Sequence, residues 1–122
     1  MGKKRNPFRM YRNIERGFYR EMMFRCVYQR RLHDLDYYAD RWDRWVNYSW
    51  LERINTMTNI LDEITNEYGV SILYELRDDI NNDIYATERI FHALCKFLSN
   101  YPSSKINDKI LKQFIMEYKF SK

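Results

Sequence analysis

The sequence predicts an all-α protein, with a basic N-terminal helical arm followed by a small helical bundle. Only three glycines and two prolines occur among the 122 residues, which leaves few residues for the tight turns that many short strands need. Hydrophobic residues make up 45% of the chain and aromatic residues 17%, so a folded protein is expected. A chain of this length is the size of one domain.

The helical pattern of the arm begins at Asn6 and Pro7. An asparagine can cap the free amide groups of a helix, and proline is well placed at the first helical position. From there the pattern stays helical to about His33. Asp34 or Asp36 begins a second helix, unless the first helix simply continues through them.

A third helix is predicted to begin at Ser49. The stretch "SWLE", Ser49 to Glu52, fits the capping box, in which the hydroxyl and the carboxylate each satisfy a terminal amide group. Apolar residues then recur at alternating steps of three and four, which places them on one stripe: Ile54, Met57, Leu61, Ile64 and Tyr68. Gly69 supplies a left-handed stop at the C-terminal end of this helix.

Three further helices complete the predicted bundle. A shorter one starts near Ser71, the next is capped by Asp83 and runs to about Asn100, and the last follows a break at Pro102. The apolar stripe of the helix that runs to about Asn100 consists of Ile90, Leu94, Phe97 and Tyr101. The stripe of the last helix consists of Ile106, Ile110, Phe114, Ile115 and Tyr118.

The arm, residues 1–48, and the bundle, residues 49–122, are predicted to form one structural domain with an uneven charge. The net charge is +4. Residues 1–31 hold ten basic and two acidic residues, a balance of +8, and residues 32–122 hold eleven basic and fifteen acidic residues, a balance of −4. The sequence therefore describes a basic arm on an acidic body.

Five arginines follow one another in the arm at steps of four, three, four and four: Arg5, Arg9, Arg12, Arg16 and Arg20. On a helix with about 100° per residue they fall within a sector of about 80°, the arginine ridge. Arg30 returns to the same sector. The opposite face, here called the aromatic face, carries Tyr11, Ile14, Phe18 and Met22. We expect the aromatic face to pack on the bundle or on a neighbouring subunit.

The arginine ridge predicts an anionic ligand, because like charges three or four residues apart on a helix repel each other. The anion could be the acidic body of the same molecule, an acidic partner protein, an anionic membrane surface or nucleic acid. A linear array of arginines suits a linear array of phosphates, so nucleic acid is favoured, with little sequence preference. The candidate contacts are the ridge together with Lys3, Lys4 and Arg30. Gly17 is either a kink, a close approach to a neighbour or a tolerated defect.

The stretch "YYADRWDRWVNYSW" places Tyr38, Trp42 and Trp45 on one helical stripe. Aromatic residues beside arginine can stack on unpaired bases. A stripe of this kind is more often core or subunit interface, and with Trp50 these residues are the candidate interface.

Neither catalysis nor a metal or cofactor site is indicated. The chain has no Gly-rich phosphate loop or nucleophile elbow, and His33 and His92 with two distant cysteines do not make a zinc site. Cys26 and Cys95 are expected to be packed thiols, with a single bridge between them left open. No apolar run approaches the roughly 18 to 20 residues that span a bilayer, and the N-terminus lacks a signal peptide's apolar core, so an intracellular protein is expected.

In plan, the stretch "MGKKRNPFRMYRNIERGFYR" followed by a bundle resembles the α-helical coat proteins of archaeal filamentous viruses. The resemblance implies that the basic N-terminal region wraps double-stranded DNA, that the arginine ridge contacts phosphates, and that the second and third helices contact other subunits. The function expected is non-enzymatic packaging of nucleic acid, with double-stranded DNA favoured, by a self-assembling coat or nucleoid-type protein, in the cytoplasm or in a virion. The alternative is a small viral inhibitor that binds an acidic surface of a host protein through the same helix.

Overall fold

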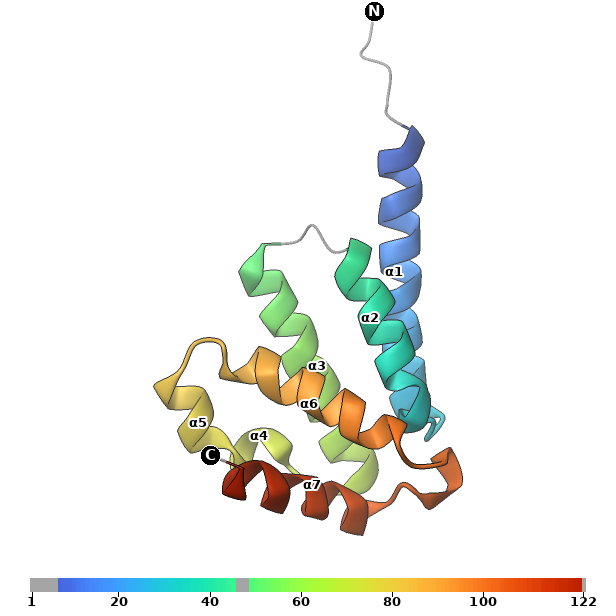
Figure 1. Ribbon diagram of the computed structural model, residues 1–122. Helices are drawn as coiled ribbons and strands as arrows, with labels where there is room; N and C mark the ends of the chain where they lie inside the picture. Colours follow the sequence, from blue (N-terminus) through green and yellow to red (C-terminus); the bar gives the residue numbers. More distant parts are fainter. Residues whose placement is uncertain (1–6, 46–48, 122) are drawn as a thin grey trace, which may run out of the picture.

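The structure is a computed structural model that describes the backbone of residues 7–45 and 49–121, and the side chains of residues 17–44 and 49–121. Within these residues the chain is helical and contains no strand (Figure 1), so the all-α prediction is confirmed. The elements are α1 (Pro7–Tyr28), η1 (Leu32–Asp34), α2 (Leu35–Trp45), α3 (Trp50–Tyr68), α4 (Ile72–Glu75), α5 (Arg77–Asn82), α6 (Ala86–Ser99), η2 (Ser103–Lys105) and α7 (Asp108–Phe120).

The first helix ends at Tyr28, five residues before the predicted end at His33. Arg30 takes a left-handed conformation with φ 54°, which an ordinary side chain adopts at a cost of about 1 to 2 kcal/mol. The reversal brings Leu32 and Leu35 into the core, where both are fully buried. Each buried leucine contributes about 1.5 to 3 kcal/mol, so their burial offsets the strained turn.

The local signals for helix ends are confirmed at three places. The Ser49 hydroxyl accepts a hydrogen bond of 3.3 Å from the Glu52 amide, and Gly69 ends α3 in the left-handed conformation with φ 73°. A break with the short η2 turn follows Pro102, as predicted. Asn107 then caps α7, accepting a hydrogen bond of 3.1 Å from the Ile110 amide.

Two helix predictions in the bundle need correction. The segment after Ser71 forms two short helices, α4 and α5, in place of one. Asp83 does not cap α6, which begins at Ala86. Its carboxylate instead accepts a hydrogen bond of 2.9 Å from the Tyr85 amide, which orders the loop before the helix.

One hydrophobic core extends across the boundary that the sequence predicted at residue 49. Fully buried side chains come from α1 and α2 as well as from the later helices, and among the largest are Met23, Leu35, Trp42, Met57, Leu61 and Phe91. The bundle therefore includes α2 and the second half of α1. Only the first half of α1 extends beyond the ends of α2 and α3 (Figure 1), so the arm is shorter than residues 1–48.

Candidate nucleic-acid interface

The second half of α1 shows which side of this helix faces the bundle. Met23, Cys26 and Val27 are buried there, where α1 packs against α2 and α3. The backbone is one continuous helix from Pro7 to Tyr28. Met23 lies seven residues after Arg16 and Val27 eleven, and at about 100° per residue such steps return to within about 20° of the same direction. Positions 9, 12 and 16 of the arginine ridge are therefore on the same side of α1 as the core.

This arrangement is the reverse of the one predicted for the aromatic face. Phe18 is 52% exposed, and Glu21, Arg25 and Tyr28 on the same outward side are exposed as well. Phe18 therefore does not pack on the bundle, and its packing on a neighbouring subunit, the other alternative, stays a prediction. The physical reason is that one straight helix has a single rotation about its axis, and burial of Met23, Cys26 and Val27 sets that rotation. The side chains of Tyr11 and Ile14 lie outside the described residues.

Arg20 stands where the arm leaves the bundle. Its side chain is partly buried, and its guanidinium carbon lies 5.1 Å from the centre of the Phe24 ring. Arg20 lines a groove of about 410 Å³ between α1 and α3, here called the α1–α3 groove. The residues that line it are Gly17, Arg20, Glu52, Asn55, Thr56 and Asn59. Of the five ridge arginines, Arg20 alone has a described side chain, because Arg5 and the side chains of Arg9, Arg12 and Arg16 lie outside the described residues. Lys3 and Lys4 lie outside them too.

Gly17 continues the helix without interruption. Apart from the backbone of its own helix and its chain neighbours, a methyl group added at its Cα would meet no described atom within 4 Å. The glycine is therefore not required for a close approach to any described residue, and its missing side chain leaves the wall of the α1–α3 groove open.

Arg30 does not belong to the arginine ridge, contrary to the prediction. It lies beyond the end of α1, and its guanidinium donates a hydrogen bond of 2.5 Å to the carbonyl oxygen of Glu67. The guanidinium carbon lies 4.7 Å from the centre of the Tyr68 ring. These contacts tie the turn after α1 to the last residues of α3, so the helical wheel used for the ridge does not apply at this position.

The predicted interface aromatics are divided between the core and the surface. Trp42 is fully buried, with the guanidinium carbon of Arg53 at 5.5 Å from its ring, so it is a core residue and not an interface residue. Tyr38 is partly buried against the core, and the side chain of Trp45 lies outside the described residues. Trp50 remains 43% exposed.

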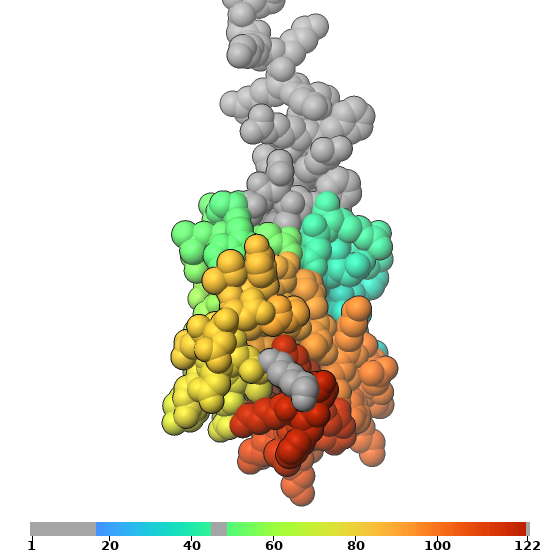
Figure 2. Space-filling model, turned by 60° about the vertical axis from the view of Figure 1, so that its left-hand side comes forward, coloured from blue at the N-terminus to red at the C-terminus, as the bar shows by residue number. Residues whose placement is uncertain are grey.

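Trp50 belongs to an exposed apolar patch that the sequence did not predict. Its ring meets that of Tyr85 edge to face at 6.1 Å, and the neighbouring Leu51 and Ile84 are also exposed. We call these four residues the Trp50 patch. Figure 2 shows the beginning of α3, in green, beside the junction of α5 and α6, in yellow to orange. Trp50 and Leu51 are far from Ile84 and Tyr85 in the sequence. Local patterns relate only residues a few positions apart, so they could not predict this patch.

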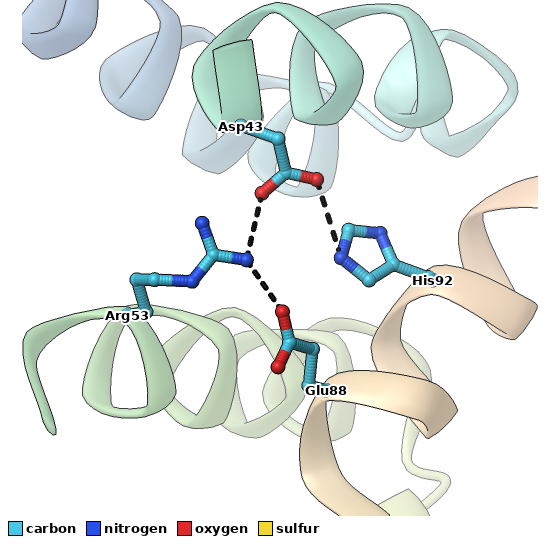
Figure 3. A network of polar contacts seen from close by, with 4 residues as sticks. All are labelled: Asp43, Arg53, Glu88 and His92. Carbon is cyan, nitrogen blue, oxygen red and sulfur yellow. Dashed lines mark hydrogen bonds and ion pairs between the residues drawn. The ribbon is translucent and has the colours of Figure 1, made fainter. Parts of the chain in front are cut away.

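A network of four charged or titratable side chains joins α2, α3 and α6 (Figure 3). Arg53 Nη2 lies 2.5 Å from Glu88 Oε1 and 3.2 Å from Asp43 Oδ1, and the other Asp43 oxygen lies 3.2 Å from His92 Nε2. Burial is the main cause that raises the pKa of Asp43. We call Asp43, Arg53, Glu88 and His92 the charge network. It holds three helices together at the end of the bundle from which the arm projects.

The stretch "HDLD" lies in a hollow of about 680 Å³ between α2 and α6. Two of its side chains have partners there: Arg31 pairs with Asp34 at 2.8 Å, and His33 Nδ1 lies 2.5 Å from the carbonyl oxygen of Tyr101. Among the described residues no group of three or more histidine, cysteine, aspartate or glutamate side chains could hold a metal ion. In the same part of the chain, no helix is both long and apolar enough to cross a membrane.

Cys26 and Cys95 are both buried, free thiols. Burial raises the pKa of Cys26 to about 11 and raises the pKa of Cys95 well above its ordinary value. Such thiols are unreactive at neutral pH. They serve as packing residues in the core.

Comparison of the chain with known protein families, with curated proteins and with solved structures found no match. Its function is therefore inferred from the geometry and chemistry of its own residues.

Proposed function

We propose that this chain is a non-enzymatic protein that binds nucleic acid with little sequence preference and packages it, with double-stranded DNA as the favoured ligand. The observation that carries the proposal is the rotation of α1. The side of the helix that faces the core in its second half carries positions 9, 12 and 16 in its first half, and the beginning of this helix extends beyond the ends of α2 and α3 (Figure 1). A ligand in the angle between the arm and the bundle would meet this side of the helix.

Phosphate is the ligand that suits this surface. Arginine presents a planar fork that binds phosphate oxygens in pairs, and positions 9 to 20 extend over about 17 Å of helix at about 1.5 Å per residue. An anion along this length relieves the repulsion between arginines three and four residues apart. Contacts of this kind are made to the sugar–phosphate backbone and carry little sequence information.

The test is the salt dependence of binding to a labelled duplex, followed by fluorescence anisotropy. Engagement of about five phosphates predicts that the logarithm of affinity falls against the logarithm of salt concentration with a slope of about −4.5. The triple variant R9E/R12E/R16E should lose binding while its unfolding curve stays that of the wild type. Binding that is insensitive to salt, or absent even at low salt, would contradict the proposal.

Self-assembly is part of the proposal, and one exposed apolar surface supports it. The Trp50 patch leaves large apolar side chains in contact with solvent, and an exposed apolar patch can mark a contact surface between proteins. Copies of the chain would then line up along the nucleic acid, as in the coat proteins that it resembles in plan. Light scattering should show larger assemblies with DNA, and the double variant W50S/I84S should reduce them without changing the salt slope of a single bound copy.

A second candidate is binding to an acidic surface of a host protein through the same helix, favoured by the exposed Phe18 on the arm helix. Here purified protein would carry no nucleic acid after a low-salt purification. The triple arginine variant would lose a protein partner and not a DNA ligand. Ultraviolet absorbance before and after a high-salt wash separates the two candidates.

A further inference from the structure

We infer that the α1–α3 groove is a second part of the nucleic-acid site, which receives one sugar–phosphate strand between Arg20 and the two asparagines of α3. This inference rests on the proposed function. It assigns Asn55 and Asn59 to the ligand, although they are far from the arginines in the sequence.

The groove continues the arginine ridge. Arg20 is the last ridge position, and it lies in the groove wall together with Gly17 on α1. Arg16 stands one turn before Arg20 on the same continuous helix. A strand that follows the ridge toward the bundle is therefore led into the groove, where α3 forms the opposite wall.

The opposite wall has the chemistry to bind a nucleotide. Asn55 and Asn59 are exposed and four residues apart on α3, which places them on one face of that helix. An asparagine amide both donates and accepts hydrogen bonds, so it can bind phosphate and sugar oxygens as well as base edges. The α3 wall thus presents amide side chains across the groove from Arg20.

The size of the groove limits what it can hold. Its volume of about 410 Å³ is at the lower end of the range for pockets that bind small molecules. It can therefore admit part of one strand, from a duplex or from single-stranded nucleic acid, and not the full width of a duplex.

Among the described residues that line the groove, Glu52 is the one carboxylate, and it opposes the binding of a phosphate. The change Glu52→Gln removes this charge and retains a side chain that suits the capping box at the start of α3. It should tighten binding by about two- to fivefold at low salt. Unchanged or weaker binding by this variant would count against the groove.

The first experiment compares two substitutions at Gly17 in the full chain. Gly17→Ala adds one methyl group and raises helix propensity, whereas Gly17→Leu has a similar helix propensity and fills the groove. Binding of labelled duplex and single-stranded oligonucleotides is measured by anisotropy at low salt. Gly17→Leu should weaken binding about tenfold relative to Gly17→Ala. Equal affinities for the two variants would overturn the inference.

The second experiment removes the two amides. The variant N55A/N59A should bind about tenfold more weakly, with the same salt slope as the wild type because no charge is lost. Asn66→Ala is the matched control, since Asn66 is exposed on α3 but does not line the groove. Wild-type affinity of N55A/N59A would overturn the inference, as would an equal loss in the control.

These outcomes are separate from a failure of the proposed function. If the wild type binds neither oligonucleotide at low salt, the proposed function fails and the groove fails with it. If the wild type binds with the expected salt slope and the groove variants bind equally well, the proposed function stands and only the groove is excluded. The two oligonucleotides also show which form of nucleic acid the groove accepts.

Discussion

The two halves of α1 present the same side of one helix to different surroundings. In the second half this side carries Met23 and Val27, which are fully buried. In the first half it carries positions 9, 12 and 16, all arginine, and the beginning of the helix extends beyond the ends of α2 and α3 (Figure 1). Along this side the residue types change from apolar to cationic toward the start of the helix. The arm therefore continues the packing face of the bundle with cationic residues in place of apolar ones.

The bundle and the arm also differ in how their charged residues are paired. In the bundle, Arg53 lies within 3.2 Å of both Asp43 and Glu88, and its side chain is only 18% exposed. In the arm, Glu15 is the one acidic residue between Arg5 and Arg20, and the next one, Glu21, pairs with Arg25 at 2.8 Å. Paired charges hold helices together, whereas an excess of one sign is suited to an external ligand of the opposite sign.

The largest expected effect comes from exchanging residues between the two halves of α1. Met23→Arg places an unpaired charge in the core and should lower the free energy of unfolding by at least about 4 kcal/mol. Arg16→Met, seven residues earlier on the same side, should change it by less than about 0.5 kcal/mol. Urea unfolding followed by circular dichroism measures both. Similar losses for the two variants would mean that position 16 is also part of the core.

Removal of the Arg53 guanidinium should have the next largest effect on the free energy of unfolding. Arg53→Met leaves Asp43 and Glu88 without their shared cation in a partly buried site, which should lower the free energy of unfolding by about 2 to 3 kcal/mol. Arg44→Met is the control, because its pair with Asp40 is exposed and should contribute less than about 1 kcal/mol. Equal effects of the two substitutions would show that the charge network stabilises the bundle no more than a surface pair does.

The charge network also predicts that the stability of the bundle depends on pH. The pKa of Asp43 is raised from its ordinary value of 3.8, mainly by burial, while His92 and Arg53 act to lower it and Glu88 to raise it. The folded state thus binds this proton more tightly than the unfolded chain does. The resulting stability is fully present below pH 3.8 and is lost as pH rises through the folded pKa.

The measurement compares the wild type with Asp43→Asn, which cannot titrate at this position. The free energy of unfolding of the wild type minus that of the variant should fall as pH rises above 3.8 and through the folded pKa of Asp43. A difference that grows with pH would show that Arg53 and His92 outweigh burial and hold the pKa of Asp43 below its ordinary value.

The last prediction concerns the reactivity of thiols along α1, which is measured on the folded protein and involves the smallest change in stability. With a pKa of about 11, Cys26 should react with Ellman's reagent at about pH 8 roughly a hundredfold more slowly than an unperturbed thiol. Phe18→Cys places a thiol on the outward side and should react at the unperturbed rate. In denaturant all thiols should react equally fast. A native Cys26 as reactive as Cys at position 18 would contradict the burial of the second half of α1.

Sequence patterns predicted the parts of the fold that depend on neighbouring residues. The cap at Ser49, the stop at Gly69 and the break after Pro102 are each made by contacts within a few positions of one another, so the local residue types are sufficient. The end of α1 was missed because no glycine or proline marks it. Its left-handed residue is Arg30, which is held by Glu67 and Tyr68 of a different helix.

The candidate site was predictable only in part. The spacing of the arginines is a property of the sequence, and a continuous α1 places positions 9, 12, 16 and 20 on one side. In the groove, Asn55 and Asn59 lie more than 30 residues after Arg20 in the sequence. In the Trp50 patch, Tyr85 lies more than 30 residues after Trp50. No local period relates such segments, so their meeting follows from helix packing.

By itself, the sequence determined that this chain is helical, where most of its later helices begin and end, and that its arginines share one helical side. These properties follow from backbone hydrogen bonds and from the 3.6-residue period of the α-helix. The tertiary structure alone decided which side of α1 faces the bundle. Both sides of this helix carry apolar residues, and the burial of Met23, Cys26 and Val27 against α2 and α3 selected one of them. This choice placed helical positions 9, 12 and 16 on the side of the core and Phe18 on the outward side.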